Sequence, residues 1–169
     1  MKKYLLLIVF AFGAFASFAQ EKNEEVTTYY LIRHAEKDRT DTNNRNPNLT
    51  AKGTDRAKHW ATVLSQANIH MVYSTDYNRT KQTALPTAEK YNLKTNLYNP
   101  RKMYDTDFIA QTKGKNVLVV GHSNTTDAFA NKILGHNKFG KISDDNNSNL
   151  YIVTVTKNNA TGVLVKIDY

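Results

Sequence analysis

Two histidines and two arginines carry the chemistry that this sequence suggests. His34 follows Arg33 directly after the apolar run TTYYLI, and His122 follows the apolar run NVLVV and one glycine. Arg79 lies in a helix-like segment between them. A neutral imidazole is a competent nucleophile near pH 7, and the planar fork of donors on arginine suits phosphoryl oxygens. Since ligands bind at the carboxyl ends of strands in an open α/β sheet, these residues predict a phosphate pocket with a nitrogen nucleophile.

The segments that must position these side chains alternate between strand-like and helix-like patterns. The first strand is apolar without alternation, as expected of a strand covered on both faces. This order predicts an α/β fold with three αβα layers: a mostly parallel sheet, helices on both faces and a C-terminal antiparallel hairpin at the edge. The predicted strands span residues 27–32, 69–73, 93–98 and 116–120. The predicted helices span residues 50–67, a segment around Arg79, residues 105–112 and a segment from Asn124 to Gly135. The predicted hairpin joins residues 150–156 to residues 162–167.

Local signals refine two of these helices. Thr50 is a good N-cap for a helix whose apolar side chains recur at helical spacing on one face. Pro86 is expected to bend or restart the helix that carries Arg79, because proline removes a backbone donor and crowds the preceding turn. The apolar stripe of the first helix consists of Ala57, Trp60, Ala61 and Leu64.

The first nineteen residues resemble a secretory signal peptide. Lys2 and Lys3 precede an apolar run that ends at Phe18, and small residues lead to Gln20. An uncleaved membrane anchor is the alternative, but the run is shorter than the roughly 20 residues that span a bilayer. We therefore expect residues 1–19 to be a cleaved signal, residues 20–169 to form one domain without stable membrane insertion, and the mature protein to be secreted or periplasmic.

Composition narrows the possible partners. The chain has no cysteine, which excludes disulfides, thiolate metal sites and a cysteine nucleophile, and which agrees with export. Its net charge of +8 favours anionic partners. The basic residues are scattered and no RNA-binding motif is present, so we predict a small phosphorylated substrate rather than nucleic acid. A metal bound by His34 and His122 would lie beside two arginines, so we predict neither a metal nor another cofactor.

Four short motifs occur in an order that resembles one family. Taken together, they look like the histidine phosphatase superfamily, with its phosphoglycerate-mutase-like fold, and the resemblance covers nearly all of the chain after residue 19. A single Arg-His pair would have no diagnostic value, whereas the ordered set does. The motifs are Arg33-His34-x-Glu36, Leu49-Thr50-x-x-Gly53, Arg79-Thr80-x-Gln82-Thr83-Ala84 and Gly121-His122-Ser123-Asn124.

The resemblance implies a role for each matching residue. His34 would be the nucleophile and would become phosphohistidine, while Arg33 and Arg79 would neutralise the charge that builds on the transferring group. His122, in its protonated form, would donate to a phosphoryl oxygen. The backbone N–H groups of Ser123 and Asn124, at the start of a helix, would add further donors to the phosphate.

The sequence departs from the family pattern at two positions. Ala35 follows the nucleophile where glycine is usual, which we expect to be tolerated unless the backbone there needs a positive φ. Asn99 stands where many relatives have an acid that protonates the leaving group, and an amide cannot supply that proton. Asp105 and Asp107 lie nearby, and Asp105 is the candidate replacement. The competing interpretation is that both are ordinary acids at a helix N-terminus.

These observations predict an exported phosphoric monoester hydrolase that works through a phosphohistidine on His34. Two alternatives stay open. The first is a phosphatase for phosphohistidine proteins, because the P–N bond breaks readily without an acid. The second is a non-catalytic relative that binds a phosphorylated ligand.

Overall fold

The computed structural model describes residues 25–169. The predicted signal at residues 1–19 lies outside the described part, so that signal and the domain boundary at Gln20 stay predictions. Among the described residues, no helix is both long enough and apolar enough to cross a membrane.

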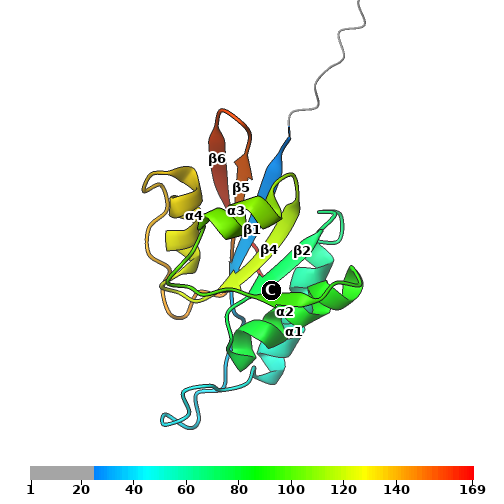
Figure 1. The fold of residues 1–169 in the computed structure, drawn as a ribbon. Helices are drawn as coiled ribbons and strands as arrows, with labels where there is room; N and C mark the ends of the chain where they lie inside the picture. Colours follow the sequence, from blue (N-terminus) through cyan, green and yellow to red (C-terminus); the bar gives the residue numbers. More distant parts are fainter. Residues whose placement is uncertain (1–24) are drawn as a thin grey trace, which may run out of the picture.

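A single six-stranded sheet forms the centre of the fold (Figure 1). Its strand order is β3-β2-β4-β1-β5-β6, in which the first four strands are parallel and the last two are added antiparallel. The predicted α/β class, the mostly parallel sheet and the C-terminal hairpin at the edge are therefore confirmed. The strands are β1 (Thr27–Arg33), β2 (Met71–Ser74), β3 (Thr95–Leu97), β4 (Asn116–Gly121), β5 (Asn149–Val155) and β6 (Ala160–Lys166).

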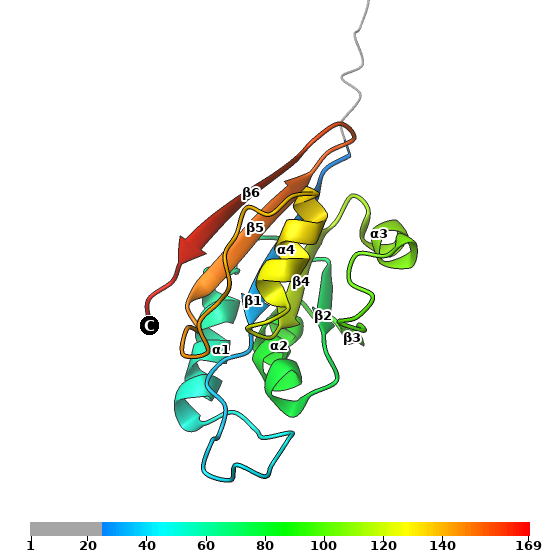
Figure 2. The same ribbon diagram turned by 90° about the vertical axis from the view of Figure 1, so that its left-hand side faces the viewer.

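Helices cover both faces of this sheet, as Figure 2 shows with α1 and α4 on opposite sides. Successive side chains of a strand point to opposite faces, so the central strands contribute to two separate cores. Tyr29 and Leu31 of β1 pack with Phe129 beneath α3 and α4, whereas Ile32 packs with Trp60 beneath α1 and α2. The helices are α1 (Ala51–Val63), α2 (Asn78–Lys90), α3 (Thr106–Thr112) and α4 (Thr126–Leu134).

The first helix, α1, begins at the N-cap that the sequence predicts. The Thr50 hydroxyl accepts a hydrogen bond from the Gly53 N–H at 3.0 Å, as predicted for an N-cap. The four residues of the predicted apolar stripe are all buried. A Cβ at Gly53 would lie 2.1 Å from the Glu36 carbonyl oxygen, so this position needs glycine for α1 to approach the loop after β1.

Pro86 does not restart α2, which was one of the two effects predicted for it. Pro86 lies inside a helix that runs without interruption from Asn78 to Lys90. Buried residues on both sides of the proline, including Ala84 and Ala88, anchor both halves of the helix to the sheet. This packing outweighs the loss of one backbone hydrogen bond.

Candidate active site

The two histidines meet because their strands are neighbours in register. β1 and β4 pair in parallel with Arg33 opposite Gly121, so His34 and His122 leave the same edge of the sheet together. The His34 N–H also donates to the Gly121 carbonyl at 3.0 Å. The two imidazole rings lie 5.4 Å apart between centroids, nearly edge to face.

The hydrogen bonding of His34 leaves one ring nitrogen ready to attack. Its Nδ1 lies 2.7 Å from the Ala35 carbonyl oxygen, which can only accept, so Nδ1 carries the proton. Burial, together with the charges of Arg33 and Arg79, lowers the pKa of His34 to about 3. The ring is therefore neutral near pH 7, and its Nε2 holds the lone pair that a nucleophile requires.

Ala35 is compatible with this geometry. Its φ is not among the positive values found for non-glycine residues in the described chain, so alanine needs no conformation that glycine alone reaches easily. The Ala35 N–H donates to the Thr83 hydroxyl at 2.9 Å, which ties the loop after β1 to α2. Asn147 adds a second tie by donating to the His34 carbonyl at 2.7 Å. The alanine is thus tolerated, as expected.

His122 is neutral in the absence of a ligand, unlike the protonated form that we expected. Burial lowers its pKa to about 4, and the charges of Arg79, Arg33 and Lys37 act in the same direction. Its Nδ1 lies 3.5 Å from Nη2 of Arg79, which can only donate, so the ring proton is on Nε2 and points to the Thr75 hydroxyl at 2.9 Å. A bound phosphate dianion would favour protonation of His122 by opposing these positive charges.

Arg79 lies against the same histidine from α2. Its guanidinium carbon is 4.4 Å from the centroid of the Tyr77 ring, and the Tyr77 ring in turn packs edge-on against His122. Tyr77 therefore helps to hold the arginine plane near the predicted phosphate position. The structure brings Arg79 together with His34 and His122 around one hollow of about 730 Å³.

Ser123 and Asn124 line that hollow too, although α4 begins later than predicted. The helix starts at Thr126, because the His122 carbonyl already accepts hydrogen bonds from the N–H groups of Thr125 and Thr126 in a tight turn. Within residues 25–169, the N–H groups of Ser123 and Asn124 have no hydrogen-bond partner. They stay available to an anion, as the sequence suggested.

Arg33 has a different environment from Arg79. Its Nη1 donates to the carbonyls of Ser143 and Asn146 at 3.0 and 3.1 Å, and its Nη2 donates to Oδ1 of Asp144 at 2.7 Å. The side chain is 2% exposed. The loop between α4 and β5 thus closes over an arginine that we predicted to face the phosphate.

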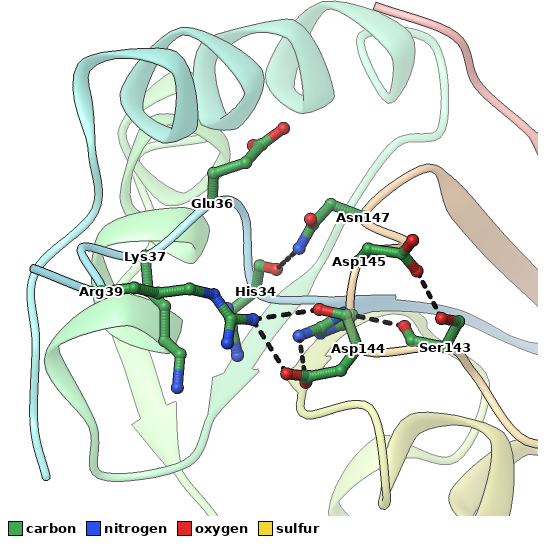
Figure 3. A pocket seen from close by; sticks show the side chains of 9 residues that line it. His34, Glu36, Lys37, Arg39, Ser143, Asp144, Asp145 and Asn147 are labelled. Carbon is green, nitrogen blue, oxygen red and sulfur yellow. Dashed lines mark hydrogen bonds and ion pairs between the residues drawn. The ribbon is translucent and has the colours of Figure 1, made fainter. Parts of the chain in front are cut away.

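A second hollow, of about 540 Å³, adjoins the first and is shown in Figure 3. His34, Lys37 and Asp144 line both hollows, so the nucleophile lies where they meet. Glu36 also lines the second hollow, but its carboxylate is held by Nε and Nη2 of Arg56 at 2.8 to 3.0 Å. That ion pair gives Glu36 a structural role at the rim of the hollow.

The candidate acid Asp105 is not brought to the nucleophile. Its side chain accepts a hydrogen bond from the Phe108 N–H at 2.9 Å and caps α3, and the residue lines a separate hollow of about 190 Å³ that lacks His34. This placement supports the competing interpretation of a helix N-terminal acid. Asn99 does line the larger hollow with His34, at the position where the proton donor was expected.

Sequence reasoning missed three residues of the site: Thr75, Asp144 and Asn147. Thr75 follows β2, the neighbour of β4, so its position at a strand end could have identified it. Asp144 and Asn147 come from an irregular polar loop with no periodic pattern, and nothing in the sequence places that loop over the end of β1.

The two buried histidines predict a specific loss of stability in acid. In the unfolded chain they titrate near pH 6.5, whereas in the folded protein they stay neutral to about pH 3 and 4. Below pH 6.5 the unfolded state therefore binds more protons, so stability falls as pH decreases toward 4. When the pH is lowered from 7.5 to 5.0, the free energy of unfolding measured with urea should fall in both proteins. The decrease should be about 1 to 2 kcal/mol smaller in His122→Asn than in wild type. An equal loss in both proteins would contradict the assignment of His122 as neutral.

Similarity to known proteins agrees with this site. The family model of the histidine phosphatase superfamily (branch 1) matches residues 29–99, which include Arg33, His34 and Arg79. No curated protein matches the chain in sequence. The resemblance to the histidine phosphatase superfamily is thereby confirmed.

Solved structures of similar fold are phosphatases that differ in substrate. A mycobacterial glucosyl-3-phosphoglycerate phosphatase, in complex with VO3, has a TM-score of 0.66 at 12% identity over 84% of this chain and 100% of its own. The protein histidine phosphatase SixA, in complex with tungstate, has a TM-score of 0.62 at 16% identity over 82% and 96%. A candidate SixA from Agrobacterium tumefaciens has a TM-score of 0.58 at 17% identity over 82% and 97%. At these identities, the likeness concerns the fold alone.

Proposed function

We propose that this protein is a phosphatase that removes the phosphoryl group from a small phosphomonoester by way of a phosphohistidine on His34. The observation that carries the proposal is the fixed tautomer of His34. Its Nδ1–H is bound to the Ala35 carbonyl, and its neutral Nε2 lies at the junction of two hollows lined by Arg33, Arg79 and His122.

The reaction would proceed in two displacements. In the first, Nε2 of His34 forms a bond to phosphorus while the bond to the leaving oxygen breaks, and Arg79 and the N–H groups of Ser123 and Asn124 stabilise the phosphoryl oxygens. In the second, water attacks phosphorus, the P–N bond breaks and inorganic phosphate is released. His34 then returns to its neutral state for the next turnover.

The leaving group is where this site differs from many relatives. Two carboxylates line the larger hollow, and both are engaged: Asp76 pairs with Lys81 at 2.7 Å and Asp144 pairs with Arg33 at 2.7 Å. Neither is placed as a free general acid, and Asn99 cannot act as one. We therefore propose phosphomonoesters whose leaving group departs without a proton, such as aryl phosphates.

The lack of a free general acid among the residues lining the larger hollow also supports a second candidate function, a phosphatase of phosphohistidine proteins. A P–N bond also breaks without strong acid assistance, and the two SixA structures share this fold. The proposal of export argues against it, because it would separate the enzyme from cytoplasmic phosphorelays. That proposal rests on residues 1–19 alone, and N-terminal sequencing of secreted or periplasmic protein, with Gln20 as the expected first residue, tests it.

Turnover of three substrate types separates these functions. We expect p-nitrophenyl phosphate to be hydrolysed and glycerol 3-phosphate, which has a poor leaving group, to react at least about a hundredfold more slowly. Preference for a phosphohistidine peptide over both esters would support the second candidate. Binding of inorganic phosphate without turnover of any substrate would indicate a non-catalytic binder and would refute both enzymatic proposals.

A further inference from the structure

One carboxylate binds Arg33, which was predicted to bind the phosphoryl group. Oδ1 of Asp144 accepts hydrogen bonds from Nη2 of Arg33 at 2.7 Å and from the Ser123 hydroxyl at 3.2 Å. Its Oδ2 accepts from Nη2 of Arg39 at 2.9 Å, and Figure 3 shows the Arg39 side chain directed at Asp144. Asp144 therefore binds the site much as an external anion would.

Orienting Arg33 does not require this carboxylate. The two Nη1 donors of Arg33 are already fixed by the backbone carbonyls of Ser143 and Asn146. Because the guanidinium is planar, these two bonds set the direction of the whole group. What Asp144 does is occupy an Nη2 donor and neutralise charge that would otherwise be available to a ligand.

The position of Asp144 allows it to leave. Its side chain is 65% exposed, whereas that of Arg33 is 2% exposed, so the carboxylate can turn into water while the arginine stays in place. Arg39, its second partner, is 56% exposed and can move with it. Asp144 also lines both hollows, as His34 does, so the carboxylate lies in the same part of the site as the nucleophile.

We propose that Asp144 is a built-in competitor for the phosphoryl group and sets the affinity of the site for phosphate. A ligand that uses Arg33 must first release the carboxylate, so its apparent dissociation constant equals the intrinsic value divided by the fraction of molecules in which Asp144 has left Arg33. A phosphoryl dianion carries twice the charge of the carboxylate and is able to displace it. The choice of phosphate as the ligand rests on the proposed function, but the competition itself does not require turnover.

Calorimetric titration of the protein with inorganic phosphate at pH 7.5 tests the proposal. In Asp144→Asn, which keeps the shape but removes the charge, we expect the dissociation constant to fall about tenfold. Asp144→Ser, which shortens the side chain, should shift it in the same direction. Asp145→Asn is the matched control, because it removes the same charge from the next residue, whose carboxylate bonds to Ser143 rather than to an arginine. Its dissociation constant for phosphate should stay within about twofold of the wild-type value.

The direction in which the affinity for phosphate changes decides whether the proposal stands. Weaker phosphate binding in both Asp144 variants would overturn the proposal and make Asp144 a positioning residue, and unchanged binding would overturn it as well. An equal gain in Asp145→Asn would attribute the effect to net charge and would also refute it. If wild type binds phosphate without hydrolysing any ester, the proposed function fails, while the ratio of dissociation constants still decides the role of Asp144.

Discussion

Replacing His34 with asparagine is expected to abolish the phosphoenzyme and to lower turnover of p-nitrophenyl phosphate by at least about a thousandfold. Asparagine can still donate from its amide to the Ala35 carbonyl in place of Nδ1, but it offers no lone pair where Nε2 was. The loss therefore reflects the nucleophile rather than the fold. Intact-protein mass after rapid acid-free quenching should show a phosphate-sized adduct in wild type and none in the variant.

His59 provides the matched control for this experiment. It packs against Tyr169, with ring centroids 4.8 Å apart, and it lines neither of the two hollows beside His34. His59→Asn should keep the adduct and wild-type turnover. Normal turnover in the His34 variant would mean that a different group, or water directly, attacks the phosphoryl group.

Replacing Arg79 with glutamine should lower kcat/KM for the same ester by about a hundredfold to a thousandfold. The donors of Arg79 are not occupied by a carboxylate, since its guanidinium contacts His122, the Arg45 carbonyl and the Tyr77 ring. Its loss removes fixed positive charge from the position where charge develops in the transition state. Steady-state kinetics with p-nitrophenyl phosphate measures the effect.

A second readout makes the Arg79 prediction more specific. The positive charge of Arg79 contributes to lowering the pKa of His122, so the pKa of His122 should rise in the glutamine variant, which NMR titration of the imidazole can follow. Lys90→Gln is the control, because Lys90 lies in the last turn of the same helix and lines neither of the two hollows beside His34. A kinetic loss of equal size in Lys90→Gln would show that net charge, rather than the geometry of Arg79, is responsible.

The two arginines that were predicted to bind phosphate, Arg33 and Arg79, differ in environment. Arg79 faces the hollow with its charge available, whereas the charge of Arg33 is shared with Asp144. If Asp144 competes with the ligand as proposed, Arg33 contributes fully only after the carboxylate has moved. The loop that carries Asp144 then affects affinity, while Asn99 limits the leaving groups that the site can release.

Much of the framework followed from local sequence patterns. The apolar runs before His34 and His122 become adjacent parallel strands, because buried strands of this kind pair inside a three-layer fold. The cap at Thr50 and the stop at Gly135, which has φ of 76°, depend on neighbouring residues only. Pro86 shows the limit of such reasoning, since burial of its neighbours overrode the local preference.

Which residues follow the ends of the strands can be read from the sequence alone, because each strand is a short apolar run and the polar residues come directly after it. The chemical state of those residues depends on tertiary packing. Both histidines are neutral because the folded chain encloses them beside arginines, and no local pattern measures that burial. Asp144 meets Arg33 across 111 residues of sequence through an irregular loop, and such a contact exists only once the sheet, the helices and the loop have packed together.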